Sequence, residues 1–124
     1  MATDLTISME DKPGTLAAAA EQLGHAGVNI EGICGYPSGG RGQGHILVED
    51  AAKARQALEA AGVRVEQERD VIVVERPDRP GELGKLSRQL ANAGINIDLI
   101  YLATRTRIVI GTPDLAKARQ VLGA

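Results

Sequence analysis

Hydrophobic residues recur along the chain with two spacings, one typical of strands and the other of helices. Leu5, Ile7 and Met9 alternate with polar residues, which predicts a half-buried strand. The next apolar residues share one face at helical spacing: Leu16, Ala19, Ala20 and Leu23. Because proline is tolerated in the first turn of a helix, Pro13-Gly14 is the predicted start of this helix.

The rest of the first half predicts one more helix and further strands. They are expected, in order, as strands at 28–34 and 44–49, a helix at 50–61 and a strand at 63–66. The glycine-rich run from Gly35 to Gly44 is expected to form the loop between two of these strands. Asp50 is the predicted N-cap of the helix, which Gly62 ends. The resulting order, β-α-β-β-α-β, is the ferredoxin-like unit.

Three blocks of the first half recur in the second half in the same order. The recurring blocks are Asp11-Lys12-Pro13-Gly14-Thr15-Leu16 as Asp78-Arg79-Pro80-Gly81-Glu82-Leu83, Gly27-Val28-Asn29-Ile30 as Gly94-Ile95-Asn96-Ile97, and residues 50–56 as residues 114–120. The first two recur 67 residues later and the third 64 residues later. Such ordered repetition indicates an internal duplication.

The second half predicts the same elements except for the last strand. The expected elements are strands at 70–75, 95–102 and 105–111 and helices at 81–93 and 114–122. We therefore expect an α+β fold of two tandem ferredoxin-like units, residues 1–68 and residues 69–124, with antiparallel sheets covered by helices on one face. Residues 63–75 are expected to form one long or bent strand that serves both units. The strand at 95–102 is apolar on both faces, which favours packing against a second subunit or the other sheet.

Composition and charge exclude several classes of protein. The 124 residues include two Tyr, no Phe and no Trp, and the net charge is −2, so a protein that stacks nucleic-acid bases in a basic groove is not expected. The sequence contains no run of 18 apolar residues, so no membrane span is predicted. The N-terminus shows no export signal and Cys34 is the single cysteine, so we expect a cytoplasmic protein without a disulfide.

The two Asp-(Lys/Arg)-Pro-Gly-x-Leu turns are the strongest candidates for binding chemistry. The N-terminus of a helix offers backbone N–H groups to anions, and Gly14 and Gly81 let a ligand approach the backbone. Asp11 and Asp78 are placed either to cap the helix or to accept a hydrogen bond from an ammonium group. Such a turn suits an amino-acid zwitterion, but the same residues also form ordinary structural turns, and duplication favours neither reading.

Asn29 and Asn96 stand out because each is expected inside an otherwise apolar strand. Asparagine is disfavoured in strands, and a buried amide needs a hydrogen-bond partner. Each side chain therefore has either a structural role or a ligand to contact. Each could face the turn of the other unit if the two sheets meet edge to edge.

Other candidate sites are weaker. Gly40-Arg41-Gly42-Gln43-Gly44 lacks the residues that follow a phosphate-binding loop, and it precedes the third strand rather than following the first, as the similar turn of acylphosphatases does. A flexible hairpin connection or a lid is the better interpretation. His25, Cys34 and His45 lack metal-ligand spacing, and no Ser-His-Asp set can be assembled. We therefore predict no catalytic residue, metal or cofactor.

The motif Asp-Arg-Pro-Gly-Glu-Leu, followed by Gly-Ile-Asn-Ile with strand, strand and helix, resembles the ACT domain, a regulatory amino-acid-binding module, and both halves carry this pattern. Two tandem copies without a catalytic domain are similar to the small ACT-only proteins. The resemblance implies that a ligand lies between two units and contacts the turn of one and the Gly-x-Asn segment of the other. The implied ligand-binding residues are Asp11, Pro13, Gly14, Thr15 and Leu16 with Asn96 and Ile97, and Asp78, Pro80, Gly81, Glu82 and Leu83 with Asn29 and Ile30.

The two implied sites differ. Glu82 stands where the first turn has Thr15, and its charge is expected to repel an anionic ligand. The leading hypothesis is a non-enzymatic, allosteric amino-acid sensor that acts as a homodimer, with an amino acid and a partner enzyme as its expected partners. The alternatives are an interaction module that assembles with an enzyme and binds no small molecule, and an enzyme of the acylphosphatase type.

Overall fold

The computed structural model describes residues 2–124, which divide into two compact units. The first unit ends at Asp70 and the second begins at Val71. Among residues 2–124, no helix is both long and apolar enough to cross a membrane.

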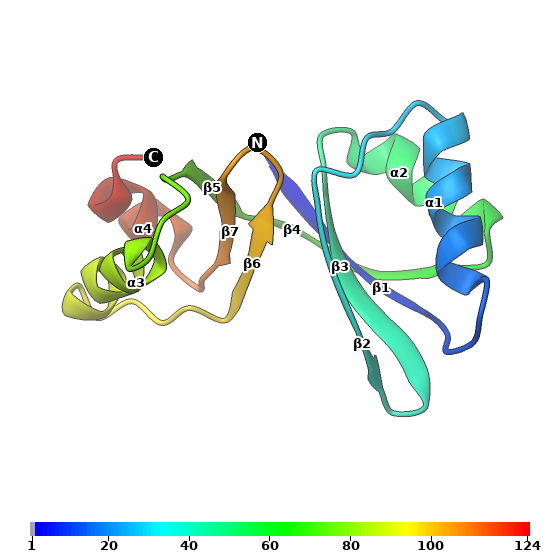
Figure 1. Ribbon diagram of the computed structural model, residues 1–124, viewed down its shortest axis with the longest axis horizontal. Helices are drawn as coiled ribbons and strands as arrows, with labels where there is room; N and C mark the ends of the chain where they lie inside the picture. The colour runs from blue at the N-terminus through cyan, green and yellow to red at the C-terminus, as the bar shows by residue number, and fades with distance from the viewer. Residues whose placement is uncertain (1) are drawn as a thin grey trace. The chain divides into compact units, whose positions relative to one another are not determined.

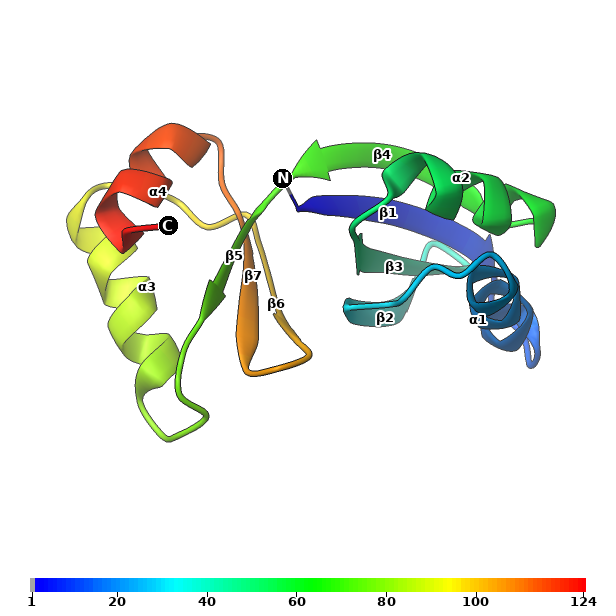
Figure 2. The ribbon, with the colours of Figure 1, turned by 90° about the horizontal axis from the view of Figure 1, so that it is seen from above.

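The first unit has the element order that the sequence predicts. Its elements are β1 (Thr3–Glu10), α1 (Thr15–His25), β2 (Gly32–Ser38), β3 (Arg41–Val48), α2 (Ala51–Ala60) and β4 (Arg64–Asp70). The strands lie in the order β4-β1-β3-β2, and the described pairs are all antiparallel. Both helices cover the same face of this sheet (Figures 1 and 2).

Alternating residues of the central strands build the core of the first unit. Leu5 and Ile7 of β1 and Ile46 of β3 point to the helices and are almost fully buried. The helices bury small residues against them, such as Ala19 of α1 and Ala54 of α2. Asp50 caps α2 as predicted, because its side chain accepts a hydrogen bond from the backbone N–H of Lys53 at 3.0 Å.

The second unit repeats this plan with a smaller sheet. Its elements are β5 (Ile72–Glu75), α3 (Glu82–Asn92), β6 (Leu99–Ala103), β7 (Arg107–Gly111) and α4 (Leu115–Leu122). The strands lie in the order β6-β7-β5, and Figure 1 shows both helices on one face. The predicted α+β fold of two ferredoxin-like units, the second lacking its last strand, is confirmed.

Two predicted strands begin later than expected, so Asn29 and Asn96 do not lie in strands. Gly27 and Gly94 end their helices in the left-handed conformation, with φ of 75° and 73°. The N–H of the next residue bonds back to the helix, and the chain then crosses to the sheet through an irregular segment. Pairing with the sheet starts only when the backbone N–H of Glu31 donates to the carbonyl of Leu47 at 3.0 Å.

The glycine-rich run is not the flexible connection that its composition predicts. It forms most of a β-hairpin, in which Gly32 pairs with Leu47 and the ladder continues to Ser38 and Arg41. Only Gly39 and Gly40 remain in the turn, where both have positive φ. Glycine carries no side chain, so it hides the alternation that normally indicates a strand.

The expected single strand over residues 63–75 is two strands. β4 pairs with β1 and ends at Asp70, and β5 pairs with β7 and begins at Ile72. Val71 separates them and is buried.

Candidate functional site

The two repeated turns have the same backbone conformation. Gly14 precedes α1 with φ 93° and ψ −17°, and Gly81 precedes α3 with φ 92° and ψ −12°. These angles lie in the left-handed region that favours glycine, which explains why the motif keeps glycine in both copies. In the first turn the hydroxyl of Thr15 donates to the carbonyl oxygens of Glu10 (2.8 Å) and Lys12 (3.0 Å) and so braces the loop.

A hollow of about 440 Å³ lies beside the first turn. It is enclosed by the end of β1, the start of α1 and the β2–β3 hairpin, all within the first unit. The lining residues are Ile7, Met9, Glu10, Asp11, Lys12, Thr15, Leu16, Ile33, Cys34, Gly35, Tyr36, Pro37, Gly42, Gln43 and Gly44. Its volume falls in the range of ~300–1,000 Å³ that small-molecule sites occupy.

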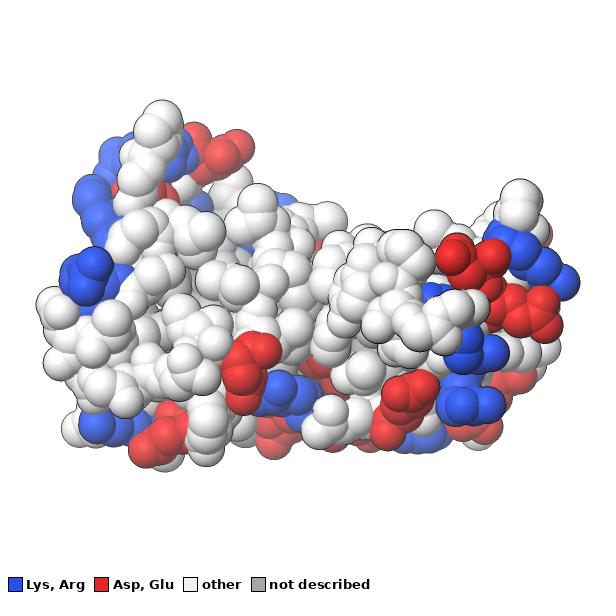
Figure 3. Space-filling view, turned by 90° about the horizontal axis from the view of Figure 1, so that it is seen from below, with Lys and Arg blue, Asp and Glu red and all other residues white. Residues whose placement is uncertain are grey.

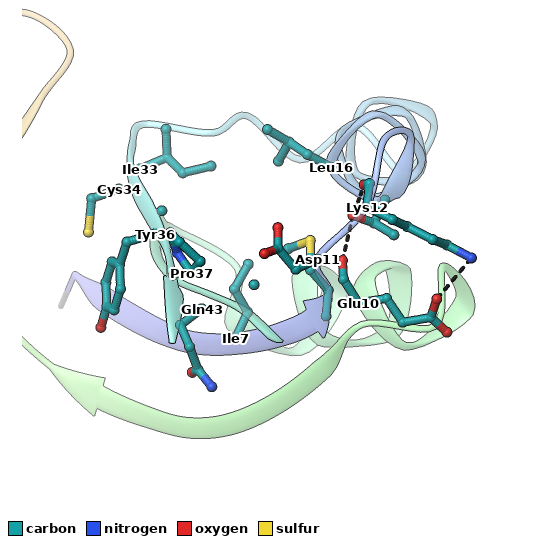
Figure 4. A pocket seen from close by; sticks show the side chains of 15 residues that line it. Ile7, Glu10, Asp11, Lys12, Leu16, Ile33, Cys34, Tyr36, Pro37 and Gln43 are labelled. Atoms are coloured by element: carbon teal, nitrogen blue, oxygen red, sulfur yellow. Dashed lines mark hydrogen bonds and ion pairs between the residues drawn. The ribbon is translucent and has the colours of Figure 1, made fainter. Parts of the chain in front are cut away.

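The charged groups at the rim point in different directions (Figure 4). Asp11 directs its carboxylate toward the hollow, whereas Lys12 extends away to an ion pair with Glu10, Nζ to Oε2 2.8 Å. The hydrogen bond and the charge of Lys12 lower the pKa of Glu10, and the same contact raises the pKa of Lys12. The charge of Lys12 is thus engaged by Glu10, so Asp11 makes the polar end of the hollow acidic.

The opposite part of the hollow is apolar. Leu16 of α1 and Ile33 of β2 face each other across it, and they remain 54% and 41% exposed (Figure 4). Three glycines line the hollow beneath them, Gly35 of β2 and Gly42 and Gly44 of β3. Figure 3 shows a face on which the charged side chains of the first unit, at the right, gather toward its outer edge beside a broad uncharged area.

The second unit has a hollow of about 300 Å³ in the equivalent place. Asp78 and Leu83 line it as Asp11 and Leu16 line the first hollow. It is bordered by three arginines: Arg76, Arg79 and Arg107. The expected repulsion by Glu82 is moderated by its neighbours, because Glu82 is nearly buried and its Oε1 accepts from Arg79 Nε at 2.8 Å and lies 3.8 Å from Lys85 Nζ.

The structure brings only part of each predicted residue set together. In the first unit Asp11, Thr15 and Leu16 line the hollow, and Pro13 and Gly14 shape the turn beside it. The equivalent residues of the second unit behave in the same way. Asp78, Glu82 and Leu83 line its hollow, and Pro80 and Gly81 shape the turn beside it.

The Gly-x-Asn segments lie at the far ends of the helices. Asn29 is exposed and lines a separate hollow of about 170 Å³ with Asp50 and Lys53. Asn96 is also exposed, and Ile30 and Ile97 pack against the cores of their own units. An 11-residue helix of ~16 Å separates each segment from the turn of its own unit. Neither asparagine therefore reaches the hollow of its own unit.

Sequence reasoning missed the hairpin side of the first hollow. Ile33, Gly35 and Gly44 lie there, and none of them was expected to bind a ligand. A signal was available, because glycines at positions 40, 42 and 44 recur with the period of two that places residues on one face of a strand.

The structure gives no support to the phosphate-binding or acylphosphatase-type turn considered for residues 40–44. Arg41 and Gly42 belong to β3 rather than to an anion-binding turn, and the Arg41 Nε donates to the buried hydroxyl of Ser8 at 2.7 Å. Burial raises the pKa of the Cys34 thiol, which disfavours the reactive thiolate. Over residues 2–124, no group of three or more His, Cys, Asp or Glu residues is arranged to hold a metal ion.

Comparison with known proteins places the fold. No family model matches the chain, and no curated protein does. The solved Bacteroides thetaiotaomicron protein BT0572 is 28% identical, with a TM-score of 0.84 over 98% of this chain and 85% of that one. The ligand-free regulatory subunit of aspartate kinase from Thermus thermophilus is 25% identical, with a TM-score of 0.72 over 98% and 89%. The same subunit from Thermus flavus is 23% identical, with a TM-score of 0.65 over 98% and 90%.

The chain therefore shares an ACT-like, two-unit fold with regulatory subunits of a kinase. Both of these aspartate kinase structures are of the regulatory subunit.

Proposed function

We propose that the protein is a non-enzymatic regulatory protein that binds an amino acid in the hollow of its first unit. The observation that carries the proposal is the arrangement of this hollow. One end presents the Asp11 carboxylate beside the start of α1, and the other end is apolar and floored by glycine. A free amino acid has the matching features, because it carries an ammonium group, a carboxylate and a side chain on one carbon.

Each end of the hollow has a distinct task in binding. The ammonium group of the ligand donates to Asp11, and its carboxylate accepts from first-turn backbone N–H groups of α1, which have no partner within a helix. Gly14 leaves this approach open, since no heavy atom lies within 4 Å of a Cβ built there. The hydroxyl of Thr15 holds the loop in the shape that this contact requires.

The resemblance to ACT domains supplies the second half of the proposal. There the ligand is held between two units, so Asn96 and Ile97 complete the site at the first turn, and Asn29 and Ile30 complete the site at the second. A ligand that bridges two units favours one arrangement of them by no more than its differential affinity for the two arrangements. We propose that a cytoplasmic homodimer passes this change to a partner enzyme.

A thermal-shift panel of the twenty standard amino acids tests the function. At a concentration ~100-fold above its dissociation constant, a ligand stabilises the folded state by ~2.7 kcal/mol, so its effect is readily seen. Asp11→Ala is expected to remove the binding in the first hollow, whereas Asp78→Ala, the matched change in the second turn, is expected to leave that binding in place. If no amino acid raises the melting temperature, the sensor is excluded and the interaction module that binds no small molecule is favoured.

A further inference from the structure

Gly35 occupies an unusual position for a glycine, the interior of a strand. It pairs with Gly44 of β3, and Gly44 pairs in turn with Ile7 of β1. These three residues form one row across the sheet, and because Ile7 belongs to the core beneath the helices, the whole row faces the helix side. The row therefore offers one apolar side chain followed by two positions without a side chain.

The two glycines are there for different reasons. A Cβ at Gly44 would lie 2.7 Å from the carbonyl oxygen of Cys34, so the backbone itself requires glycine at that position. A Cβ at Gly35 would lie 3.6 Å from the nearest atom, the carbonyl oxygen of Gln43, which is an ordinary contact. The φ of Gly35 is also not among the positive values of the chain. Folding alone therefore does not demand glycine at position 35.

A glycine inside a strand weakens the strand, and it often marks a place where a ligand or another backbone approaches closely. Gly35 lines the hollow together with Leu16 and Ile33, and it lies on the same face of β2 as Ile33, two residues before it. The missing side chain therefore leaves more room in the hollow beside Ile33.

The second unit shows the same row with its side chains present. Leu102 of β6 pairs with Ile108 of β7 at the register where the first unit has Gly35 and Gly44. Leu102 is 68% exposed and lines the smaller hollow of about 300 Å³. The same fold therefore carries two glycines at this pair in the first unit and two large side chains in the second. The second unit thus shows how this position looks when it is filled.

We propose that the space above Gly35 receives the side chain of the ligand, and that this side chain is a neutral, branched aliphatic one. The inference rests on the proposed function, since Asp11 and the start of α1 must hold the two charged groups of the amino acid. Leu16, Ile33 and Ile7 present only hydrocarbon to a side chain that enters there. These residues offer no partner to a charged side chain, whereas they contact an aliphatic one favourably. Gly35 sets the length of the side chain that fits.

Calorimetric titration of the full chain with valine, leucine, isoleucine, alanine, aspartate and lysine tests this assignment. Unmodified protein is expected to bind the branched aliphatic amino acids most tightly. Gly35→Leu, which copies Leu102, is expected to weaken that binding by about tenfold or more, because a pocket that loses a few methylenes of space discriminates on this scale. Gly35→Ala is expected to shift the preference toward alanine, and it keeps the test valid if the leucine variant does not fold.

Ser38→Leu is the matched control, because it adds the same side chain at the end of β2 outside the hollow. Its binding profile is expected to stay unchanged. The inference is overturned if aspartate or lysine binds most tightly, or if Gly35→Leu binds as the unmodified protein does. In both of these cases an amino acid still binds, so the proposed function stands. Absence of binding by all six, together with a negative twenty-member panel, overturns both.

Discussion

Gly35 of β2 and Gly44 of β3 are cross-strand partners, and neither carries a side chain into the hollow beneath Leu16. The second unit has Leu102 and Ile108 at the same register, and its hollow is smaller. Because the two units share one fold, this pair is a clear local difference between them. The two hollows that the duplicated fold forms differ in size and lining.

The Gly44 position is expected to be intolerant of any side chain. Gly44→Ala places a Cβ against the carbonyl oxygen of Cys34, so the hairpin must shift, at a cost of ~1–3 kcal/mol. Gly35→Ala is the matched change on the partner strand and is expected to leave the free energy of unfolding equal or slightly higher. Urea unfolding of both variants measures the difference, and equal destabilisation by the two would contradict the assigned contact.

The Gly14 position is expected to require glycine for its backbone angle. Gly14→Ala forces an L-residue into φ near 93°, which costs ~1–2 kcal/mol. Gly24 lies within α1 with no atom near its Cβ position, so Gly24→Ala is expected to stabilise the protein by ~1 kcal/mol through helix propensity. Thermal unfolding of the two variants should therefore move in opposite directions, and a stabilised Gly14→Ala variant would be incompatible with the turn described.

Cys34 is expected to react slowly with thiol reagents in the folded protein. Burial raises its pKa above the ordinary 9.0 and outweighs the opposing backbone hydrogen bond from His45. The folded state thus favours the neutral thiol. The contribution of Cys34 to the stability of the folded protein is therefore fully present below pH 9 and is lost as the pH rises through the folded pKa. The rate of alkylation by iodoacetamide, measured between pH 7 and 10, should reach its midpoint at a higher pH in the folded protein than in the protein unfolded in urea. An earlier midpoint would mean that the thiol is activated.

The sequence predicts the architecture well because the duplication supplies independent signals. The Pro-Gly turns and the Asp50 and Asp114 caps mark where helices begin, and the matching α1 and α3 confirm them. The predicted 68/69 boundary falls two residues before the Asp70–Val71 division of the structure.

The hairpin carries a weaker signal in the sequence, the period-two spacing of Gly40, Gly42 and Gly44. Gly35 and Gly44 are nine positions apart in the chain, and only the register of β2 against β3 makes them neighbours. Composition predicts a loop for such a run, because glycine is common in turns and shows no hydrophobic alternation. The hollow depends on this pairing, so its apolar side became visible only in the structure.

A crystal structure of the protein with the tightest-binding amino acid of the panel would locate the ligand itself. Density for that amino acid is expected in the first hollow, with its ammonium group at Asp11 and its side chain above Gly35, between Leu16 and Ile33. Density for the amino acid elsewhere on the chain, with this hollow filled only by water, would contradict this placement.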